Sequence, residues 1–308
     1  DNIAIKFSNE LGSNRELTYN NLYSEVSKLQ KYMVDIGIVK GDRIAAYMPN
    51  IPETVICMLA SASIGAIWTS CSPDFGVNGA LDRFRQVEPK LLISTNGYYY
   101  KGKDIHLSNK IELICNSLKS VENTLIVNYS KVKWSNAKVP KLMLYENLCA
   151  CNSDIKFNQL PFNHPLYIMY SSGTTGEPKS IVHSAGGTLI QHKKELILHS
   201  DLKEEDVIFY YTTCGWMMWN WLISSLSVGA SIVLYDGSPF FPDNSSLLKL
   251  IDTFKINIFG TSAQYIAYLE KNKVYPSEIS DANSLRTILS TGSPLSANSY
   301  DFVYSKWK

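Results

Sequence analysis

The sequence predicts an α/β protein made of two consecutive βαβ-type subdomains whose parallel sheets pack together. From Gly41 onward, short apolar runs alternate with stretches of helical periodicity. This order is typical of parallel strands joined by helical crossovers. Hydrophobic residues make up 45% of the 308 residues and charged residues 19%, which is enough apolar surface for a sizeable core. We expect the first subdomain at 1–160 and the second at 161–308, with the boundary near 160–164.

In the first subdomain, the clearest helix follows a short strand that begins after a Gly-Asp turn. Pro52 fits the first turn of this helix and Gly65 fits its end. The next helix stops before Pro89, which cannot continue it. The segment from 97 to 163 is less regular and richer in Asn, Lys and Ser. We predict strands at 43–48, 67–70, 90–95 and 124–128, and helices at 52–66, 77–87 and 109–121.

The alternation resumes after residue 164, and its first two strands are separated by a loop at 171–179 instead of a helix. No repeat of fixed period and no low-complexity tract is visible in this part of the sequence. We predict strands at 166–170, 180–183, 207–211, 231–235, 257–260 and 287–290, and helices at 187–199, 217–226, 245–254 and 263–270.

Charge and cysteine content argue against several classes of protein. Lys and Arg number 29 against 28 Asp and Glu, a net charge of +1, so we expect neither a nucleic-acid nor a membrane partner. The uncharged stretch at 216–235 contains Asn, Gly and several Ser residues, and we interpret it as a buried helix and strand instead of a membrane span. Of six cysteines, only Cys149 and Cys151 are close, and no second pair completes a zinc site. We expect reduced, intracellular thiols.

The loop at 171–179 is the most informative segment. Its glycines allow positive φ and a close approach of backbone to a ligand, and successive N–H groups in such a turn form an anion-binding concavity. Hydroxyl groups add donors and a terminal lysine adds a positive charge. The residues that carry this pattern are Ser171, Ser172, Gly173, Thr174, Thr175, Gly176 and Lys179.

This pattern predicts a loop that holds phosphate. It differs from the common nucleotide loop G-x-x-x-x-G-K-[ST], because its glycines are closer together and Pro178 precedes the lysine. A flexible surface loop rich in Ser, Thr and Gly is the alternative interpretation. Strands on both sides of the loop and the Pro-Lys ending favour the phosphate-binding interpretation.

The segment Tyr-Ser-Ser-Gly-Thr-Thr-Gly-Glu-Pro-Lys at 170–179 resembles the characteristic loop of the AMP-forming acyl-CoA synthetases. Three further segments resemble this adenylate-forming family in the same order along the chain: 41–50, 64–76 and 289–295. The resemblance extends from about residue 18 to residue 295, and it implies the fold of the large N-terminal domain of these enzymes.

Within that family, Gly-Trp-Met-Met-Trp-Asn-Trp at 215–221 resembles the branch that activates acetoacetate, as do 182–192 and 234–239. The resemblance implies a ligase that joins acetoacetate to coenzyme A through an acyl-adenylate, with ATP and Mg²⁺, releasing AMP and pyrophosphate. An acetyl- or propionyl-CoA synthetase and a non-catalytic nucleotide-binding or acyl-adenylate-binding module are the alternatives. A peptide-synthetase adenylation unit is disfavoured by the segment 68–76.

The resemblance also implies roles for single residues. Lys179 and Thr174 are expected in catalysis, and residues 171–176 with Lys179 around the β- and γ-phosphates. Asn220 is a hypothetical donor to the keto oxygen of acetoacetate, although packing within a helix explains this residue equally well. The acyl pocket is expected at Trp216, Met217, Met218 and Thr291, and the adenylate-lining segment at Gly292, Ser293 and Pro294. The family often has an acidic residue where Ser293 stands.

Several family elements are expected outside this sequence: the Glu that holds Mg²⁺, the ribose-binding Asp, the hinge and the small C-terminal lid domain. We therefore expect a fragment of the N-terminal domain that turns over little alone, and we expect no metal ligands in it. His183 is expected to be a structural partner and His192 to be solvated. The resemblance further implies a cytosolic enzyme that uses ketone-body carbon for lipid synthesis.

Overall fold

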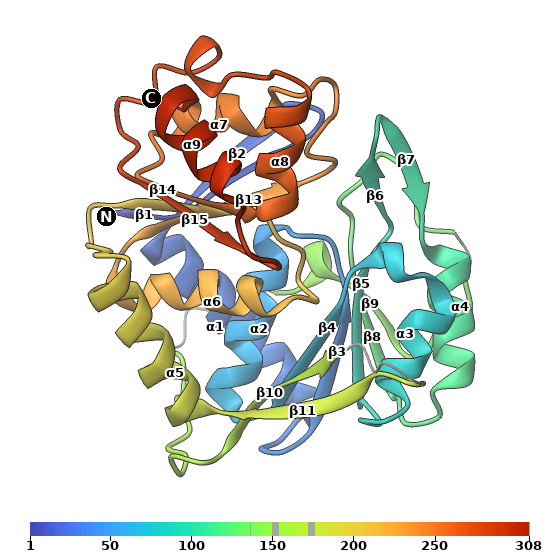
Figure 1. Ribbon diagram of the computed structural model, residues 1–308. Helices are drawn as coiled ribbons and strands as arrows, with labels where there is room; N and C mark the ends of the chain where they lie inside the picture. The colour runs from blue at the N-terminus through green and yellow to red at the C-terminus, as the bar shows by residue number, and fades with distance from the viewer. Residues whose placement is uncertain (136, 150–153, 172–175, 308) are drawn as a thin grey trace.

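The computed structural model describes residues 1–135, 137–149, 154–171 and 176–307 (Figure 1). Two sheets carry the architecture. Sheet A has the strand order β15 (Thr287–Thr291), β14 (Ile258–Ser262), β12 (Val207–Tyr210), β13 (Ser231–Asp236), β1 (Ile3–Asn9) and β2 (Asn14–Thr18). Sheet B has the order β11 (Lys179–Ser184), β10 (Pro165–Ser171), β4 (Ile67–Cys71), β3 (Arg43–Tyr47), β5 (Leu91–Thr95), β8 (Asn123–Val127) and β9 (Leu142–Leu144).

Both sheets are parallel except at one edge each, where β2 runs antiparallel to β1 and β11 runs antiparallel to β10. A separate antiparallel hairpin is formed by β6 (Gly97–Tyr100) and β7 (Lys103–His106). These observations confirm the α/β class with two parallel sheets, which the alternation of strands and helices predicted.

Nine α-helices occur among the described residues: α1 (Tyr19–Asp35), α2 (Pro52–Ile64), α3 (Gly76–Phe84), α4 (Ser108–Ser117), α5 (Ala185–Lys194), α6 (Met217–Ser224), α7 (Ser246–Phe254), α8 (Ala263–Lys271) and α9 (Ala297–Lys306). A π-helical turn at Glu195–His199 extends α5. Helix α2 illustrates how the sequence sets its ends: Pro52 occupies the first turn, and Gly65 ends the helix with a left-handed φ of 81°.

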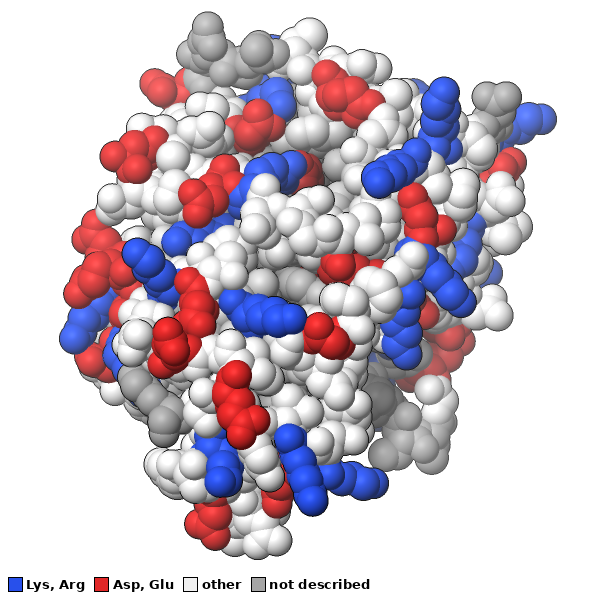
Figure 2. All heavy atoms as spheres, turned by 90° about the horizontal axis from the view of Figure 1, so that it is seen from above, with Lys and Arg blue, Asp and Glu red and all other residues white. Residues whose placement is uncertain are grey.

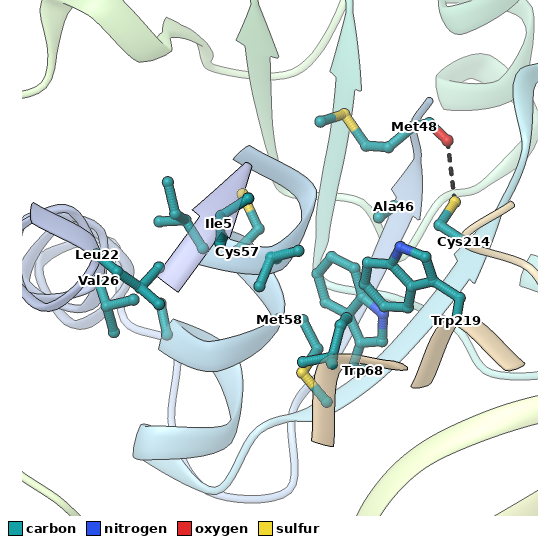
Figure 3. Packing of buried hydrophobic residues seen from close by; sticks show 14 of the residues in the cluster. Ile5, Leu22, Val26, Ala46, Met48, Cys57, Met58, Trp68, Cys214 and Trp219 are labelled. Atoms are coloured by element: carbon teal, nitrogen blue, oxygen red, sulfur yellow. Dashed lines mark hydrogen bonds between the residues drawn. The ribbon is translucent and has the colours of Figure 1, made fainter. Parts of the chain in front are cut away.

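The helices and sheets form five layers (Figure 1). Helices α7, α8 and α9 cover the outer face of sheet A, and α3 and α4 cover the outer face of sheet B. Between the sheets lie α1, α2 and α6, whose apolar residues join both inner faces in one core. Figure 3 shows this core, in which Ile5 of sheet A, Leu22 of α1 and Trp68 of sheet B belong to the same buried cluster.

The strands of each sheet come from both sides of the predicted boundary at 160–164. Strands β1 and β2 precede the boundary yet complete sheet A, and β10 and β11 follow it yet complete sheet B. The boundary therefore divides the chain by sequence order and not by sheet. Alternation of strands and helices reports the order of elements, but it does not report which strands share hydrogen bonds.

On the face seen from above Figure 1, basic and acidic side chains are interspersed (Figure 2). None of the described helices is both long and apolar enough to cross a membrane. The stretch at 216–235, which carries no charge, is divided between α6, a short 3-10 segment and β13. Within the described part of the chain, the free cysteines are Cys57, Cys71, Cys115, Cys149 and Cys214.

Candidate functional site

The two stems of the predicted phosphate loop are the last residue of β10 and the first residue of β11. Ser171 and Lys179 are directly paired across these antiparallel strands. Gly176 has a φ of 148°, and a Cβ added there would meet nothing within 4 Å. The remaining predicted loop residues lie outside the described residues: Ser172, Gly173, Thr174 and Thr175.

The pleat of β10 determines which way each stem faces. Met169 contacts α6, because the amide Nδ2 of Asn220 lies 3.7 Å from the sulfur of Met169. Tyr170 faces α3 on the other side of the sheet, where the guanidinium carbon of Arg83 is 5.8 Å from its ring centroid. Side chains alternate along a strand and directly paired residues share a face. Ser171 and Lys179 therefore lie on the face of sheet B that α6 covers.

The segment 215–221, predicted to line an acyl pocket, forms the start of α6 and the turn before it. Trp216 is 61% exposed and Met217 is 45% exposed, whereas Trp219 is fully buried. The ring of Trp219 stacks on Trp68 of β4 with 6.5 Å between centroids (Figure 3). Met218 is half-buried. The helix is therefore anchored by Trp219 while its first residues stay accessible to a ligand.

Asn220 connects α6 to the strand that leads into the loop. Its side chain is 4% exposed, and its Oδ1 atom is buried without a hydrogen-bond partner among the described residues. Within the described part of the chain, the Nδ2 group reaches only the Met169 thioether, a weak acceptor. A buried amide with unused hydrogen-bonding capacity is costly in an apolar core, so this position fits a group that bonds a ligand.

The turn before α6 is attached to the ends of sheet B. Ser70 Oγ donates to the carbonyl of Cys214 at 2.5 Å. Figure 3 shows the second bond, in which Cys214 Sγ donates to the carbonyl of Met48 at 2.9 Å. Asn50, just beyond β3, donates through Nδ2 to the carbonyl of Thr212 and accepts from Trp219 Nε1 at 2.9 Å. These bonds bring the carboxyl ends of strands from the two sheets together.

Carboxyl ends of parallel strands are where ligands bind in open α/β sheets. β12, β14 and β15 are parallel neighbours, so Thr291 at the end of β15 lies on the same sheet edge as the turn that leads into α6. Thr291 and the three residues after it are exposed, and Gly292 has a φ of 95°. Ser293 and Pro294 line an open hollow of about 650 Å³ beside α9.

A polar cluster that the sequence did not predict lies where the two sheets meet. Asp236, the last residue of β13, is 8% exposed and accepts a hydrogen bond from the Tyr129 hydroxyl at 2.9 Å. Burial raises the pKa of Asp236 to about 7. Asp236 and Asp74 both line a small cavity of about 100 Å³. The sequence signal that could have revealed this cluster was an acidic residue, Asp236, directly after the apolar strand predicted at 231–235.

One histidine prediction was wrong. His192 is buried, 6% exposed, and its Nδ1 lies 2.8 Å from Ser224 Oγ; α6 packs over this position, which helix periodicity alone did not reveal. The ring of His183 packs at a tilt against Tyr167, with 5.1 Å between centroids, as expected for a structural partner. Burial lowers the pKa of both imidazoles.

The chain is similar to known proteins along its whole length. The family described as AMP-binding enzyme matches residues 1–308, the whole chain. The chain belongs to the AMP-binding enzyme family. The resemblance to the adenylate-forming family, which the sequence predicted from several segments, is thereby confirmed.

Individual relatives are similar over nearly the whole chain. Acetoacetyl-CoA synthetase of Danio rerio is 48% identical over 298 residues, which cover 94% of this chain and 44% of that protein. Malonamoyl-CoA synthetase of Penicillium aethiopicum is 39% identical over 98% of this chain and 45% of that protein. The structure of acetoacetyl-CoA synthetase from Streptomyces lividans superposes with a TM-score of 0.95 at 37% identity, covering all of this chain and 47% of that one. This AMP-binding enzyme chain thus spans less than half the length of the relatives it matches.

Proposed function

We propose that the full-length protein activates acetoacetate to acetoacetyl-CoA, and that this chain provides the phosphate-binding loop and much of the acyl pocket. The observation that carries the proposal is the placement of Lys179 on the same face of sheet B as α6, with Asn220 of α6 touching the strand that ends at Ser171. This placement supports a cation for phosphate beside a binding region for a small acid. The similarity to acetoacetyl-CoA synthetases supports the same conclusion.

The chemistry has two steps. A carboxylate oxygen of the acid attacks the α-phosphorus of ATP, and pyrophosphate leaves with the electrons of the broken P–O bond. The thiol sulfur of coenzyme A then attacks the acyl carbon, loses its proton, and AMP leaves. The first step brings an anion against a polyanion, so fixed donors and cations must offset the repulsion.

Lys179 and the hydroxyl and backbone donors of 171–176 take this role at the β- and γ-phosphates, with Thr174 as a donor to the phosphate that departs. Gly292, Ser293 and Pro294 line the adenylate. Mg²⁺ supplies charge neutralisation on the phosphates when bound. Among the described residues no three His, Cys, Asp or Glu side chains gather to hold a metal, so we assign the ion no ligand and no step here.

The acyl pocket is formed by Trp216, Met217 and Met218 on one side and Thr291 on the other. Acetoacetate carries a carbonyl oxygen two carbons from its carboxylate, and a pocket specific for it needs a hydrogen-bond donor at that distance. The buried amide of Asn220 supplies the donor. Malonamate, the acid implied by the Penicillium relative's name, has a carbonyl at the same position, so a shared donor fits both acids.

Acid preference tests the proposal directly. AMP formation by the full-length protein is measured with ATP, Mg²⁺ and coenzyme A, using acetoacetate, acetate, propionate and butyrate in turn. The proposal expects the highest kcat/KM with acetoacetate. A preference for acetate or propionate would instead identify the protein as an acetyl- or propionyl-CoA synthetase. Binding of ATP without activation of any acid identifies a non-catalytic nucleotide-binding module.

We place the enzyme in the cytosol, where it would direct ketone-body carbon into lipid synthesis. This placement depends on the family resemblance of the loop and of the α6 segment. Fractionation of cells that express the tagged full-length protein tests it, and recovery with a membrane or organelle fraction contradicts it.

A further inference from the structure

A glutamine outside the predicted site holds the strand that begins with Lys179. Gln86 lies two residues beyond α3, and its Nε2 donates to the carbonyl of Pro178 at 2.7 Å. Its Oε1 accepts a hydrogen bond from Ser180 Oγ, also at 2.7 Å. One amide side chain thus holds the residue before Lys179 and the residue after it. Nε2 also donates to the carbonyl of Asp82 at 2.6 Å, which ties the amide to α3.

The two contacts determine the direction of Lys179. Ser180 points toward Gln86 on the α3 side of sheet B. Because side chains alternate along a strand, Lys179 projects from the opposite side, where α6 lies. Gln86 holds the carbonyl of Pro178, which precedes Lys179, and the side chain of Ser180, which follows it. Together these two bonds limit rotation of the backbone at Lys179.

The other stem is held from the same helix. Tyr170 pairs directly with Ser180 across the two strands, and its hydroxyl accepts a hydrogen bond from Thr69 Oγ1 at 2.9 Å. Arg83 of α3 lies between the rings of Phe75 and Tyr170, at 4.2 and 5.8 Å from their centroids. The end of α3 and the residues just beyond it therefore support both strands that lead into the loop.

From these contacts we infer that Gln86 is a positioning residue for Lys179. Gln86 acts through Pro178 and Ser180 and directs the lysine toward the phosphates on the α6 side. This inference rests on the proposed function, since it assigns Lys179 to ATP. Gln86 is exposed, so its replacement removes no core packing and the variants should fold.

Gln86→Ala in the full-length protein tests the inference. We expect the KM for ATP to rise and kcat to fall, by roughly 10- to 100-fold in kcat/KM, because a misplacement of about 1 Å can cost on the order of 100-fold. The KM for the acid should stay within about 2-fold, since α6 is not touched. Gln191→Ala is the matched control: among the described residues the Gln191 amide donates to Glu195 of its own helical segment and to no other group, and the kinetics of this variant should match the wild type.

Two further variants separate positioning from a general loss of structure. Gln86→Glu keeps the acceptor for Ser180 and loses the donor to Pro178, so its activity relative to wild type should recover as pH falls and the carboxyl gains a proton. Ser180→Ala combined with Gln86→Ala should cost little more than Gln86→Ala alone. Additive losses in the double variant, or equal changes in the KM for ATP and for the acid, overturn the inference.

Hydrogen exchange distinguishes failure of the inference from failure of the proposed function. Amides at the start of β11 should exchange faster in Gln86→Ala than in the wild type or Gln191→Ala, whether or not the protein activates an acid. An active wild type with Gln86→Ala kinetics unchanged overturns the inference and leaves the function intact. If the wild-type protein activates no acid, the proposed function is wrong. The role of Gln86 in binding ATP is then wrong too, because it depends on that function.

Discussion

At the scale of single residues, two side chains carry most of the proposed chemistry. Lys179 is exposed at the first position of β11 and forms none of the ion pairs found among the described residues. Asn220 is buried, and its donor group Nδ2 reaches the Met169 thioether, a weak acceptor. An accessible cation suits a polyanionic ligand, and a buried amide suits a small polar one.

Lys179→Ala should slow acetoacetate-dependent pyrophosphate exchange by about 100-fold in the full-length protein, because one preorganised donor to developing charge contributes on that order. Lys271→Ala, an exposed lysine in the last turn of α8, should leave exchange unchanged. Unchanged pyrophosphate exchange in Lys179→Ala would mean that Lys179 does not bind the phosphates.

Asn220→Ala should reduce the preference for acetoacetate over butyrate by about 5-fold, because one hydrogen bond contributes roughly 1 kcal/mol. Butyrate lacks the keto oxygen, so its kcat/KM should change little. The measurement is kcat/KM for both acids with each protein, together with a melting curve to show that the variant is folded. A variant that keeps the full preference assigns Asn220 to helix packing instead.

At the scale of elements, the position of α6 depends on a junction that no single element provides. Asn50 follows β3 of sheet B. It bonds the carbonyl of Thr212, just beyond β12, the carbonyl of Tyr235 on β13 and the indole of Trp219 on α6. All three contacts are buried. The acyl segment is thus held by one amide between the carboxyl ends of two sheets.

Asn50→Ala should lower the free energy of unfolding by about 2–4 kcal/mol, since it leaves an indole N–H and two carbonyls without partners in a buried place. Asn272→Ala is the surface control. The exposed amide of Asn272 donates to the carbonyl of Tyr268 near the end of α8, and its removal should change stability by less than about 0.5 kcal/mol. Denaturant unfolding measures both. A loss below about 1 kcal/mol in Asn50→Ala would show that water replaces these bonds.

Local signals predicted most elements of this structure. Pro52 and Gly65 marked the ends of α2, and the strands at 43–48, 67–70 and 90–95 agree with β3, β4 and β5 to within two residues at either end. Strands β1 and β2 and helix α1 were not predicted. Ile5 pairs with Ile232 of β13, and β13 was predicted at 231–235, but which strands pair across more than two hundred residues cannot be predicted from either segment alone.

The candidate site was predictable where a single segment carries the chemistry. The loop at 171–179 was predicted to hold phosphate from its glycines, hydroxyls and lysine, and this role stays a prediction. Gln86 and Asn50 were not, because their roles exist only through contacts with Pro178 and Trp219, each about a hundred or more residues away. His192 was placed wrongly for the same reason: the helix that buries it follows later in the chain.

At the scale of the whole molecule, the junction between the sheets holds buried acidic groups. Asp236 ends β13 of sheet A, and its hydrogen-bond donor Tyr129 follows β8 of sheet B. Glu10 directly follows β1, the strand that pairs with β13. It accepts three backbone hydrogen bonds, from Lys101, Gly102 and Ser238. Burial is the largest cause that raises the pKa of Asp236, and the charge of Glu10 adds to it.

The raised pKa of Asp236 predicts how stability depends on pH. In the unfolded chain this carboxyl loses its proton near pH 3.9, whereas in the folded protein it keeps the proton up to about pH 7. Between these values the folded state binds more protons than the unfolded state, so the contribution of Asp236 to stability is full below pH 4 and is lost as pH rises to 7.

Asp236→Asn removes this titration and keeps an acceptor for Tyr129. Relative to the wild type, the variant should therefore gain stability as pH rises from 4 to 7, by an amount on the order of 3 kcal/mol, and the difference should level off above pH 7. Unfolding by denaturant at several pH values measures this difference. The effects of the other carboxyl groups on stability cancel, because those groups titrate in both proteins.

Asp243→Asn, at an exposed position, is the control and should show no such gain. A difference that stays constant from pH 4 to 8 would mean that Asp236 is charged in the folded protein throughout, and that the junction between the sheets solvates a carboxylate.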